Sequence, residues 1–228
     1  MNEEIVGYHG TKKEYEKAIV QSGFKESKAN RGHWLGRGIY FYGNIYYAIE
    51  WGIVNFSSQW NNYNNFISDC SVIQCFIDVD NFNIMDLNDP IGYIYYLKIL
   101  EIVEQKFPDK IESIRNNGDV QIIQLLEEIE IKTGEKYISM FDIVVADYPK
   151  DIYKKKEGKR PGDFLPCIQK QICVKNSDAI KEIKAMKLDN SFIKSYFDTI
   201  IKNREENENE KQRRNIGKAA RKNKKYTR

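Results

Sequence analysis

Three stretches of the sequence, far apart along the chain, contain the residues that could do chemistry. In the first, GYHGT, His9 stands at the end of an expected strand, and Gly10 can bring its backbone against a ligand. The second, GRGIYFYGNIYYAIEW, combines turn-forming glycines with aromatic residues such as Tyr40 and Trp51. The third, QKQICVKN, carries Gln171 on a late expected strand. The glycines and rings indicate a place where backbone and flat side chains approach a ligand.

Other common site chemistries are not expected. The four cysteines have no close paired spacing, and the two histidines, His9 and His33, lie far from them in the sequence. We therefore expect no metal site and assign the cysteines as reduced, partly buried thiols. GRGIYFYG lacks the spacing of the dinucleotide-binding fingerprint, and the phosphate-binding Walker loop is absent.

The elements expected to position these stretches alternate between strands and helices. Apolar alternation and β-prone residues indicate strands at 4–11, 38–42, 70–87, 141–148 and 167–176. Helical spacing indicates helices at 12–22 with a stop at Gly23, at 44–52 closed by Gly52, at 91–131 with breaks near Pro108 and Gly118, and from 191 onward. WNNYNNF, residues 60–66, is expected to be a polar-aromatic loop.

This order of elements favours an α+β domain with a mixed or mainly antiparallel sheet over a parallel doubly wound fold. We expect one domain at 1–202, with a helical insertion at about 90–137, and a charged tail at 203–228. The first residues lack the layout of a signal peptide, and no apolar run approaches the roughly 18 residues of a membrane helix. A cytoplasmic protein without membrane contact is the simplest expectation.

The tail differs in charge from the rest of the chain. Residues 211–228 carry 9 Lys or Arg and no acidic residue, which leaves 27 basic and 33 acidic side chains before them. So polar and basic a segment cannot bury enough surface to fold alone. It is either a solubilising end or a phosphate-binding arm for nucleic acid.

Taken in order, the three stretches resemble the motif triad of the ADP-ribosyltransferases of the poly(ADP-ribose) polymerase and diphtheria-toxin type. That triad is a His-Gly-Ser/Thr strand end, a Gly-x-Gly-Ile-Tyr-Phe turn and a late strand opening with Glu or sometimes Gln. The resemblance covers about residues 5–180 and leaves out the insertion and the tail. It implies the split mixed or antiparallel sheet of that fold and NAD as the co-substrate, without a metal.

The resemblance also assigns roles to residues. It implies a catalytic set of His9, Tyr40 and Gln171, in which His9 binds a ribose hydroxyl of NAD and Tyr40 lines the nicotinamide pocket. The other implied NAD-binding residues are Gly10 for the carboxamide, Thr11 at the usual Ser or Thr position, Gly38 in the turn, and Trp51 stacked on the nicotinamide.

Two positions depart from the family pattern. Ala48 stands where many members have a carboxamide-binding serine, so that the amide is left to Gly10. Gln171 replaces the usual catalytic Glu and keeps a hydrogen bond without the negative charge. That exchange fits a single transfer of ADP-ribose better than chain elongation.

The acceptor of ADP-ribose stays open at this stage. Gln169 lies two residues before Gln171 on the same strand face, where family members often orient the target. The preceding loop contains Lys159 and Arg160 among five basic residues, and is either a solvated surface loop or a contact for a phosphate-bearing target. Nucleic acid and protein are both candidate acceptors.

The resemblance therefore predicts a mono-ADP-ribosyltransferase that transfers ADP-ribose from NAD to a macromolecule. A small enzyme of this kind is similar to the toxic member of a bacterial toxin–antitoxin or phage-defence set, which would add an antitoxin protein as a partner. Two alternatives are kept: a tRNA 2′-phosphotransferase-like enzyme, and a non-catalytic module that binds NAD or nucleic acid.

Overall fold

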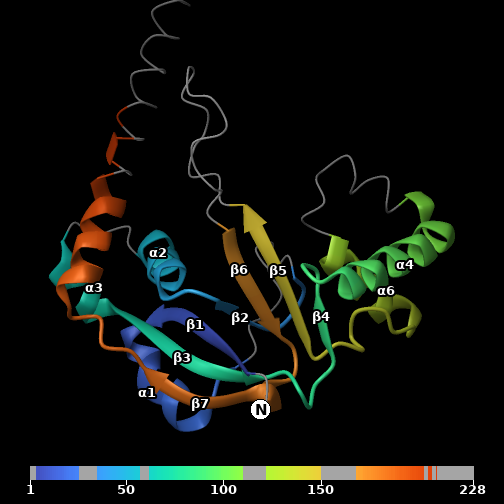
Figure 1. Cartoon of the computed structure of the whole chain (residues 1–228), viewed down its shortest axis with the longest axis horizontal. Helices are drawn as coiled ribbons and strands as arrows, with labels where there is room; N and C mark the ends of the chain where they lie inside the picture. The colour runs from blue at the N-terminus through green and yellow to red at the C-terminus, as the bar shows by residue number, and fades with distance from the viewer. Residues whose placement is uncertain are drawn as a thin grey trace, which may run out of the picture.

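The computed structural model describes residues 4–25, 35–56, 62–109, 122–149 and 168–202, together with 205, 206 and 209. These residues are built around a seven-stranded sheet with the order β4-β5-β6-β2-β1-β3-β7 (Figure 1). Neighbouring strands are antiparallel except β4 and β5, which are parallel. The predicted α+β class with a mixed, mainly antiparallel sheet is confirmed. The strands are β1 (Glu4–Lys12), β2 (Ile39–Tyr42), β3 (Cys70–Asp78), β4 (Ile84–Asp86), β5 (Ile143–Pro149), β6 (Ile168–Val174) and β7 (Ile180–Ala185).

The sheet divides between β1 and β2. Strand β1 pairs with β3 along its whole length, from Glu4↔Asp78 to Lys12↔Cys70. With β2 it shares a single registered pair, Tyr8↔Tyr42. In Figure 1, β1, β3 and β7 run across the lower part of the molecule, whereas β4, β5 and β6 stand upright. The two groups of strands therefore diverge beyond Tyr8, on the side of His9.

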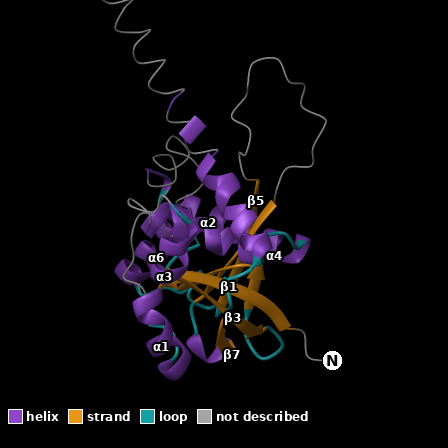
Figure 2. Ribbon diagram, turned by 90° about the vertical axis from the view of Figure 1, so that its left-hand side faces the viewer, coloured by secondary structure: helices purple, strands orange, loops and turns teal. Residues whose placement is uncertain are grey.

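Two helices cover opposite faces of the β1–β3 half. Helix α1 (Lys13–Ser22) lies below β3, and helix α2 (Ile45–Phe56) lies above β1 (Figures 1 and 2). Ser71 of β3 donates a hydrogen bond to Glu16 of α1 at 2.5 Å. On the other face, a Cβ built on Gly10 would lie 2.4 Å from the carbonyl oxygen of Ala48 in α2. Gly10 thus allows α2 to pack directly onto β1.

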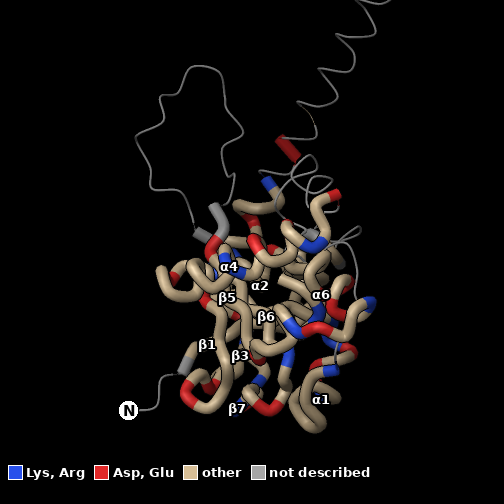
Figure 3. Tube along the Cα trace, turned by 90° about the vertical axis from the view of Figure 1, so that its right-hand side faces the viewer, with Lys and Arg blue, Asp and Glu red and all other residues tan. Residues whose placement is uncertain are grey.

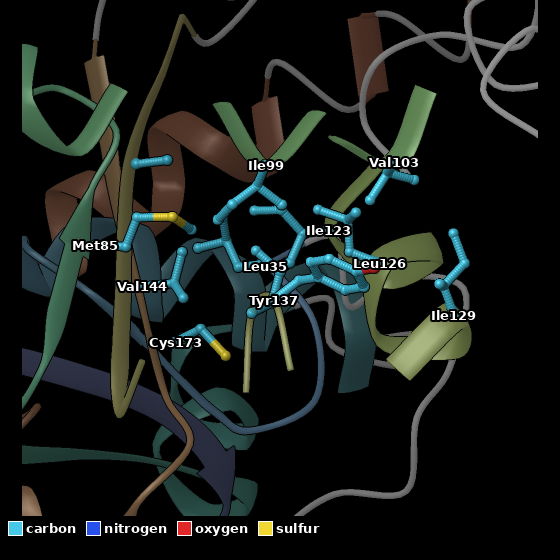
Figure 4. Packing of buried hydrophobic residues seen from close by; sticks show 12 residues of the cluster. Leu35, Met85, Ile99, Val103, Ile123, Leu126, Ile129, Tyr137, Val144 and Cys173 are labelled. Carbon is cyan, nitrogen blue, oxygen red and sulfur yellow. The ribbon is translucent and has the colours of Figure 1, made fainter. Parts of the chain in front are cut away.

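The helical insertion lies between β4 and β5. Helix α4 (Pro90–Lys106) and helix α6 (Ile122–Thr133) pack their apolar residues against the upright half of the sheet (Figure 4). Leu35, which precedes β2, is fully buried in the same cluster, and Tyr40 packs against it. The insertion predicted at about 90–137 is therefore helical over α4 and α6 but not at 134–137, and it forms the apolar surroundings of Tyr40.

A second apolar cluster joins α2 to helix α3 (Tyr63–Asp69) and to the helical residues 191–202. The expected loop at 60–66 is wrong for its described part. Asn62 caps α3 by accepting a hydrogen bond from the Asn65 amide at 2.9 Å. Tyr63 and Phe66, one turn apart, are both buried, and the rings of Phe66 and Phe197 have centroids 5.1 Å apart. Burial of these aromatic residues outweighs the polar composition of the segment.

Two elements also have other bounds than expected, and one strand was not predicted. Helix α2 does not end at Gly52 but continues to Phe56, because Gly52 serves close packing: a Cβ there would lie 2.7 Å from Cys70 Sγ. The expected strand at 70–87 is interrupted after Asp78, whose carboxylate accepts hydrogen bonds from the Asp80 and Asn81 amides in a turn. Strand β7 was not predicted, because its burial does not alternate.

No helix in the described ranges is both long and apolar enough to cross a membrane. The boundary expected at residue 202 stays a prediction, since most of residues 203–228 lie outside the described ranges.

Candidate functional site

His9 bridges the division of the sheet. Beyond the pair Tyr8↔Tyr42, no further residue pair of β1 and β2 is in register within the described strands. There the Nδ1 atom of His9 lies 2.8 Å from the backbone oxygen of Tyr40. A carbonyl oxygen can only accept, so Nδ1 carries the proton. A side-chain hydrogen bond from His9 thus spans the point where the two strands separate.

The environment of His9 favours the neutral imidazole. Its half-buried ring lies 5.1 Å from the Phe24 ring and 5.9 Å from the Phe41 ring, measured between centroids, and makes edge contacts with both. Burial lowers the pKa of His9 below its ordinary value, although the hydrogen bond to Tyr40 acts in the opposite direction. With the proton on Nδ1, neutral His9 presents Nε2 as a hydrogen-bond acceptor. An acceptor of this kind can bind a hydroxyl group.

An aromatic surface lies beside His9. The ring of Trp51, on α2, has its centroid 6.4 Å from that of His9, and Trp51 is 36% exposed. A Cβ on Gly10 would lie 3.4 Å from Trp51 Cε3, so the glycine and the indole are neighbours. Ala48, three residues before Trp51, is fully buried against Gly10. The structure therefore brings His9, Gly10, Ala48 and Trp51 together.

Tyr40 is held by the loop that precedes it. Its hydroxyl accepts a hydrogen bond from the Leu35 amide and donates one to the Gly36 carbonyl, each at 2.8 Å. Burial raises the pKa of Tyr40 far above its ordinary value, so the hydroxyl stays protonated and is no candidate base. Its ring faces the insertion cluster, while its backbone oxygen faces His9.

The glycines of the loop meet protein atoms at close range. Gly36 has φ +89° and Gly38 has φ +153°, conformations that favour glycine. A Cβ on Gly38 would lie 2.6 Å from Cys173 Sγ on β6. A Cβ on Gly36 would lie 2.2 Å from Glu127 Oε1. Packing of the loop against β6 and α6 therefore already requires these glycines. Their presence alone does not indicate a ligand contact.

Gln171 lies on the strand next to β2. It pairs with Tyr42 of β2 and with Ala146 of β5, and Tyr40 pairs with Cys173 two residues further along β6. Gln171 and Tyr40 are thus diagonal neighbours on one sheet face, at a spacing of roughly 7–8 Å between Cα atoms. Gln171 is 8% exposed, and its amide has no hydrogen-bond partner among the described residues. Such an amide can bind a ligand that approaches this face.

The positions of the remaining predicted residues say less about a ligand. Thr11 is buried opposite Ser71 on β3, and Gln169 is half-buried opposite Tyr148 on β5. Lys159 and Arg160 lie outside the described residues. No group of His, Cys, Asp or Glu in the described ranges is arranged to hold a metal ion.

Sequence reasoning missed two groups near the site. Tyr42, directly opposite Gln171, has a raised pKa because it is buried and because the negative charge of Glu50 on α2 lies nearby. Glu127 of α6 binds the Arg37 amide with both carboxylate oxygens, at 3.0 and 2.8 Å. Tyr42 was detectable from period-2 alternation with Tyr40, but nothing in the sequence connects Glu127 with residues 90 positions earlier.

The comparisons with known proteins do not name an activity. An uncharacterized protein of the archaeon Methanocaldococcus jannaschii is 27% identical over 192 residues, which cover 78% of this chain and 85% of that protein. No protein-family model matches the chain. No solved structure matches it either. The arrangement of the site is therefore the basis on which a function can be proposed.

Proposed function

We propose that this chain is a mono-ADP-ribosyltransferase that cleaves NAD and transfers ADP-ribose to a macromolecule. The observation that carries the proposal is the position of His9 at the division between β1 and β2. Its Nδ1 is bound to the Tyr40 carbonyl, which leaves Nε2 as an acceptor beside the exposed ring of Trp51. This pair of groups suits nicotinamide riboside. The hydrogen-bond acceptor would bind a ribose hydroxyl, and the flat aromatic ring would hold the nicotinamide.

Further contacts support the same ligand. The nicotinamide of NAD is a planar cation, which aromatic faces attract. Gly10 lies directly beside Trp51 and Ala48, so its backbone is near the ring that would hold the nicotinamide. In the related family a glycine and a serine share the carboxamide, and here the two corresponding residues, Gly10 and Ala48, are neighbours. The alanine supplies no hydroxyl, which leaves the carboxamide to the Gly10 backbone.

The proposed reaction breaks the bond between nicotinamide and the anomeric carbon of ribose. Nicotinamide leaves with the bonding electrons and becomes neutral, so it needs no acid, and a nucleophile of the acceptor bonds to the anomeric carbon and loses its proton to water. Positive charge develops on the ribose, as in glycoside hydrolysis. Gln171 offers the ribose a hydrogen bond from the neighbouring strand but no negative charge, which is consistent with one transfer rather than elongation.

The proposed acceptor is a nucleic acid or a protein. Acidic and basic positions are interspersed along the described trace on the face seen in Figure 3. The basic loop containing Lys159 and Arg160 favours a phosphate-bearing acceptor, and so do the basic residues 211–228. Both segments lie outside the described residues. We propose a toxin or defence role, restrained by an antitoxin protein, as the setting of this activity.

The test is incubation with NAD labelled in the adenosine part, with and without cell extract. Release of nicotinamide together with label on a macromolecule is expected for the wild-type protein, and nuclease or protease treatment identifies the acceptor class. His9→Ala is expected to abolish transfer while circular dichroism stays unchanged. Tyr15→Ala, which removes an exposed ring on α1, is the matched control and keeps full activity. Full activity of His9→Ala would contradict the proposal.

A second candidate is a module that binds NAD without cleaving it. The absence of a carboxylate at Gln171 and of a hydroxyl at Ala48 favours it. Calorimetry that detects NAD binding, combined with no nicotinamide release from any acceptor mixture, would select this alternative.

A further inference from the structure

A buried ion pair joins the helical insertion to the loop that precedes Tyr40. Glu127 of α6 pairs with Lys175, which directly follows β6, and their side chains are only 11% and 12% exposed. The Glu127 carboxylate accepts the Arg37 amide hydrogen, and Lys175 Nζ donates to the Arg37 carbonyl at 3.3 Å. The pair therefore binds both backbone polar groups of Arg37.

The same loop is also held by Tyr40. The Tyr40 hydroxyl binds the Leu35 amide and the Gly36 carbonyl. Gly36 lies so close to the ion pair that a Cβ would be 2.2 Å from Glu127 Oε1 and 2.6 Å from Lys175 Nζ. The loop between Leu35 and Tyr40 thus has one defined path, fixed by Tyr40 and by Glu127.

These contacts form a continuous series that ends at His9. Glu127 binds the Arg37 amide, the neighbouring Gly36 carbonyl accepts from the Tyr40 hydroxyl, and the Tyr40 carbonyl accepts from His9 Nδ1. Replacing a buried ion pair by apolar groups is often neutral for stability, so stability alone gives little reason for the charges. Directional hydrogen bonds to a backbone amide and carbonyl fix the path of the loop, which apolar packing cannot do.

We propose that Glu127 is a positioning residue for the candidate NAD site. It fixes the loop from Leu35 to Gly38, and through Tyr40 it fixes the carbonyl that orients the His9 ring. The inference rests on the proposed function, and it gives the helical insertion, which lies outside the family resemblance, a part in the chemistry. Trp51 and Gly10 do not depend on this loop, so NAD binding and NAD cleavage should respond differently.

Cys173 supplies a measure of loop position that does not depend on NAD. Its fully buried thiol lies under the loop, with Sγ 3.5 Å from the Arg37 carbonyl oxygen and 3.8 Å from that of Gly36. Cys75 is also fully buried, but on the other sheet face, and burial raises its pKa to about 12. Labelling by a thiol reagent, followed residue by residue with mass spectrometry, reports whether the loop leaves Cys173 while Cys75 serves as the internal reference.

The experiment compares Glu127→Gln with the wild-type protein in both measurements. We expect labelling of Cys173 to become at least about tenfold faster and that of Cys75 to stay unchanged. Displacement of a positioned group by about 1 Å can cost about 10²-fold in rate, so kcat for nicotinamide release should fall by up to that factor. KM for NAD should rise by a smaller factor, because only the hydrogen bond of His9 is weakened.

Glu135→Gln is the matched control. It breaks the ion pair of Glu135 with Lys106, which lies in the same part of the chain but is exposed, with Nζ and Oε2 2.7 Å apart. Neither labelling of Cys173 nor kcat should change. If Glu127→Gln does not fold, as judged by thermal melting, the double variant Glu127→Gln/Lys175→Met replaces it, because no buried charge is then left without a partner.

Each result decides one part of the inference. Faster Cys173 labelling together with a lower kcat supports the positioning role. Faster labelling with an unchanged kcat overturns it, and unchanged labelling shows that Glu127 does not hold the loop. A wild-type protein that cleaves no NAD overturns the proposed function separately, because the labelling rates still decide whether Glu127 holds the loop.

Discussion

Strand β1 pairs along its whole length with one neighbour, β3, and at a single position with the other, β2. Towards β3 it forms nine registered pairs, from Glu4↔Asp78 to Lys12↔Cys70. Towards β2 it forms one pair, after which the hydrogen bond of His9 to the Tyr40 carbonyl takes over. The β3 side carries residues such as Val72 and Ile73 that are completely buried. Packing alone explains the side of β1 that faces β3, which we call the closed side. The side that faces β2, which we call the open side, carries polar groups placed where they could bind a ligand.

The open side has a physical cost. Alternate residues of a strand turn their N–H and C=O groups to each neighbour, so the missing ladder beyond Tyr8 leaves backbone groups of residues 9–12 without strand partners on that side. Buried backbone groups almost always find partners, in the protein, in water or in a ligand. His9 satisfies one group of β2 in this way. A ligand bound along the division would satisfy others.

The largest effect is expected for Gln171 on β6, the strand that pairs with β2 on the edge away from β1. Loss of one preorganised hydrogen bond to the developing charge typically slows a reaction by about 10²-fold or more, so Gln171→Ala should reduce nicotinamide release by that factor. Gln171→Glu supplies a carboxylate and should keep or raise the rate. Steady-state assays of nicotinamide release measure both. Lys170→Ala, on the opposite sheet face, is the control, and an unchanged rate in Gln171→Ala would remove Gln171 from the site.

The second prediction concerns Gly10 of β1, against which helix α2 packs. Gly10→Ala places a Cβ 2.4 Å from the Ala48 carbonyl oxygen, a backbone atom that cannot yield without movement of α2. Such overpacking should lower the free energy of unfolding by about 1–3 kcal/mol, towards the upper end. A Cβ on Gly43 would lie 3.0 Å from Lys170 Cβ, and its nearest neighbours are all side-chain atoms of Lys170, so Gly43→Ala should cost less. Urea unfolding compares them, and equal stability of the two variants would show that α2 does not rest on Gly10.

The sequence predicted the closed side of β1 better than the open side. The β-prone stretch CSVIQCFID indicated β3. Its first four residues are all buried, and the later ones alternate between buried and half-buried, so the sequence pattern follows the burial of the strand. The stop of α1 at Gly23 was predictable as well, since the Gly23 amide closes the helix on the Ile19 carbonyl. Gly52 misled the same reasoning: a glycine required for contact with Cys70 looks in the sequence like one that ends a helix.

The candidate site was predictable where its residues are close in sequence or share a motif. His9, Gly10 and Trp51 do come together, as the resemblance implied. Glu127 could not be found, because its contact with Arg37 depends on how the insertion folds back onto the sheet. Nor could the sequence reveal that Gly36 is required by that carboxylate, since a tight turn beside a ligand and a tight turn beside Glu127 require the same residue.

A smaller effect is expected from the aromatic surface on the open side. If the Trp51 ring holds the nicotinamide, Trp51→Ala should weaken NAD binding by about 1–3 kcal/mol, the value of a flat stacking platform. Trp51→Phe should recover part of that loss. Calorimetric titration with NAD measures the difference, and Tyr15→Ala removes an exposed ring elsewhere as the control. Unchanged affinity in Trp51→Ala would place the ligand away from α2.

The smallest effect should appear in the dependence of stability on pH. Burial lowers the pKa of His9 in the folded protein, whereas in the unfolded chain a histidine titrates near about 6.5. Between those two pKa values the unfolded state binds a proton that the folded state does not. The contribution of neutral His9 to stability is therefore fully present above about pH 7 and is lost as the pH falls through 6.5 towards the folded pKa, with a slope of at most about 1.4 kcal/mol per pH unit.

His9→Gln isolates this contribution, because the variant lacks the titrating group on the open side and keeps every other one. Urea unfolding at several pH values between about 7.5 and 5.5 should show a steeper loss of stability for the wild-type protein than for His9→Gln. Carboxylates with a lowered pKa, such as Glu16 and Asp78, titrate below this window and do not obscure it. Over the same range the wild-type protein should bind NAD more weakly as the pH falls, since protonated Nε2 can no longer accept a ribose hydroxyl. Equal slopes for the two proteins would mean that His9 is already solvated, and the division between β1 and β2 would then be open to water rather than closed around a neutral histidine.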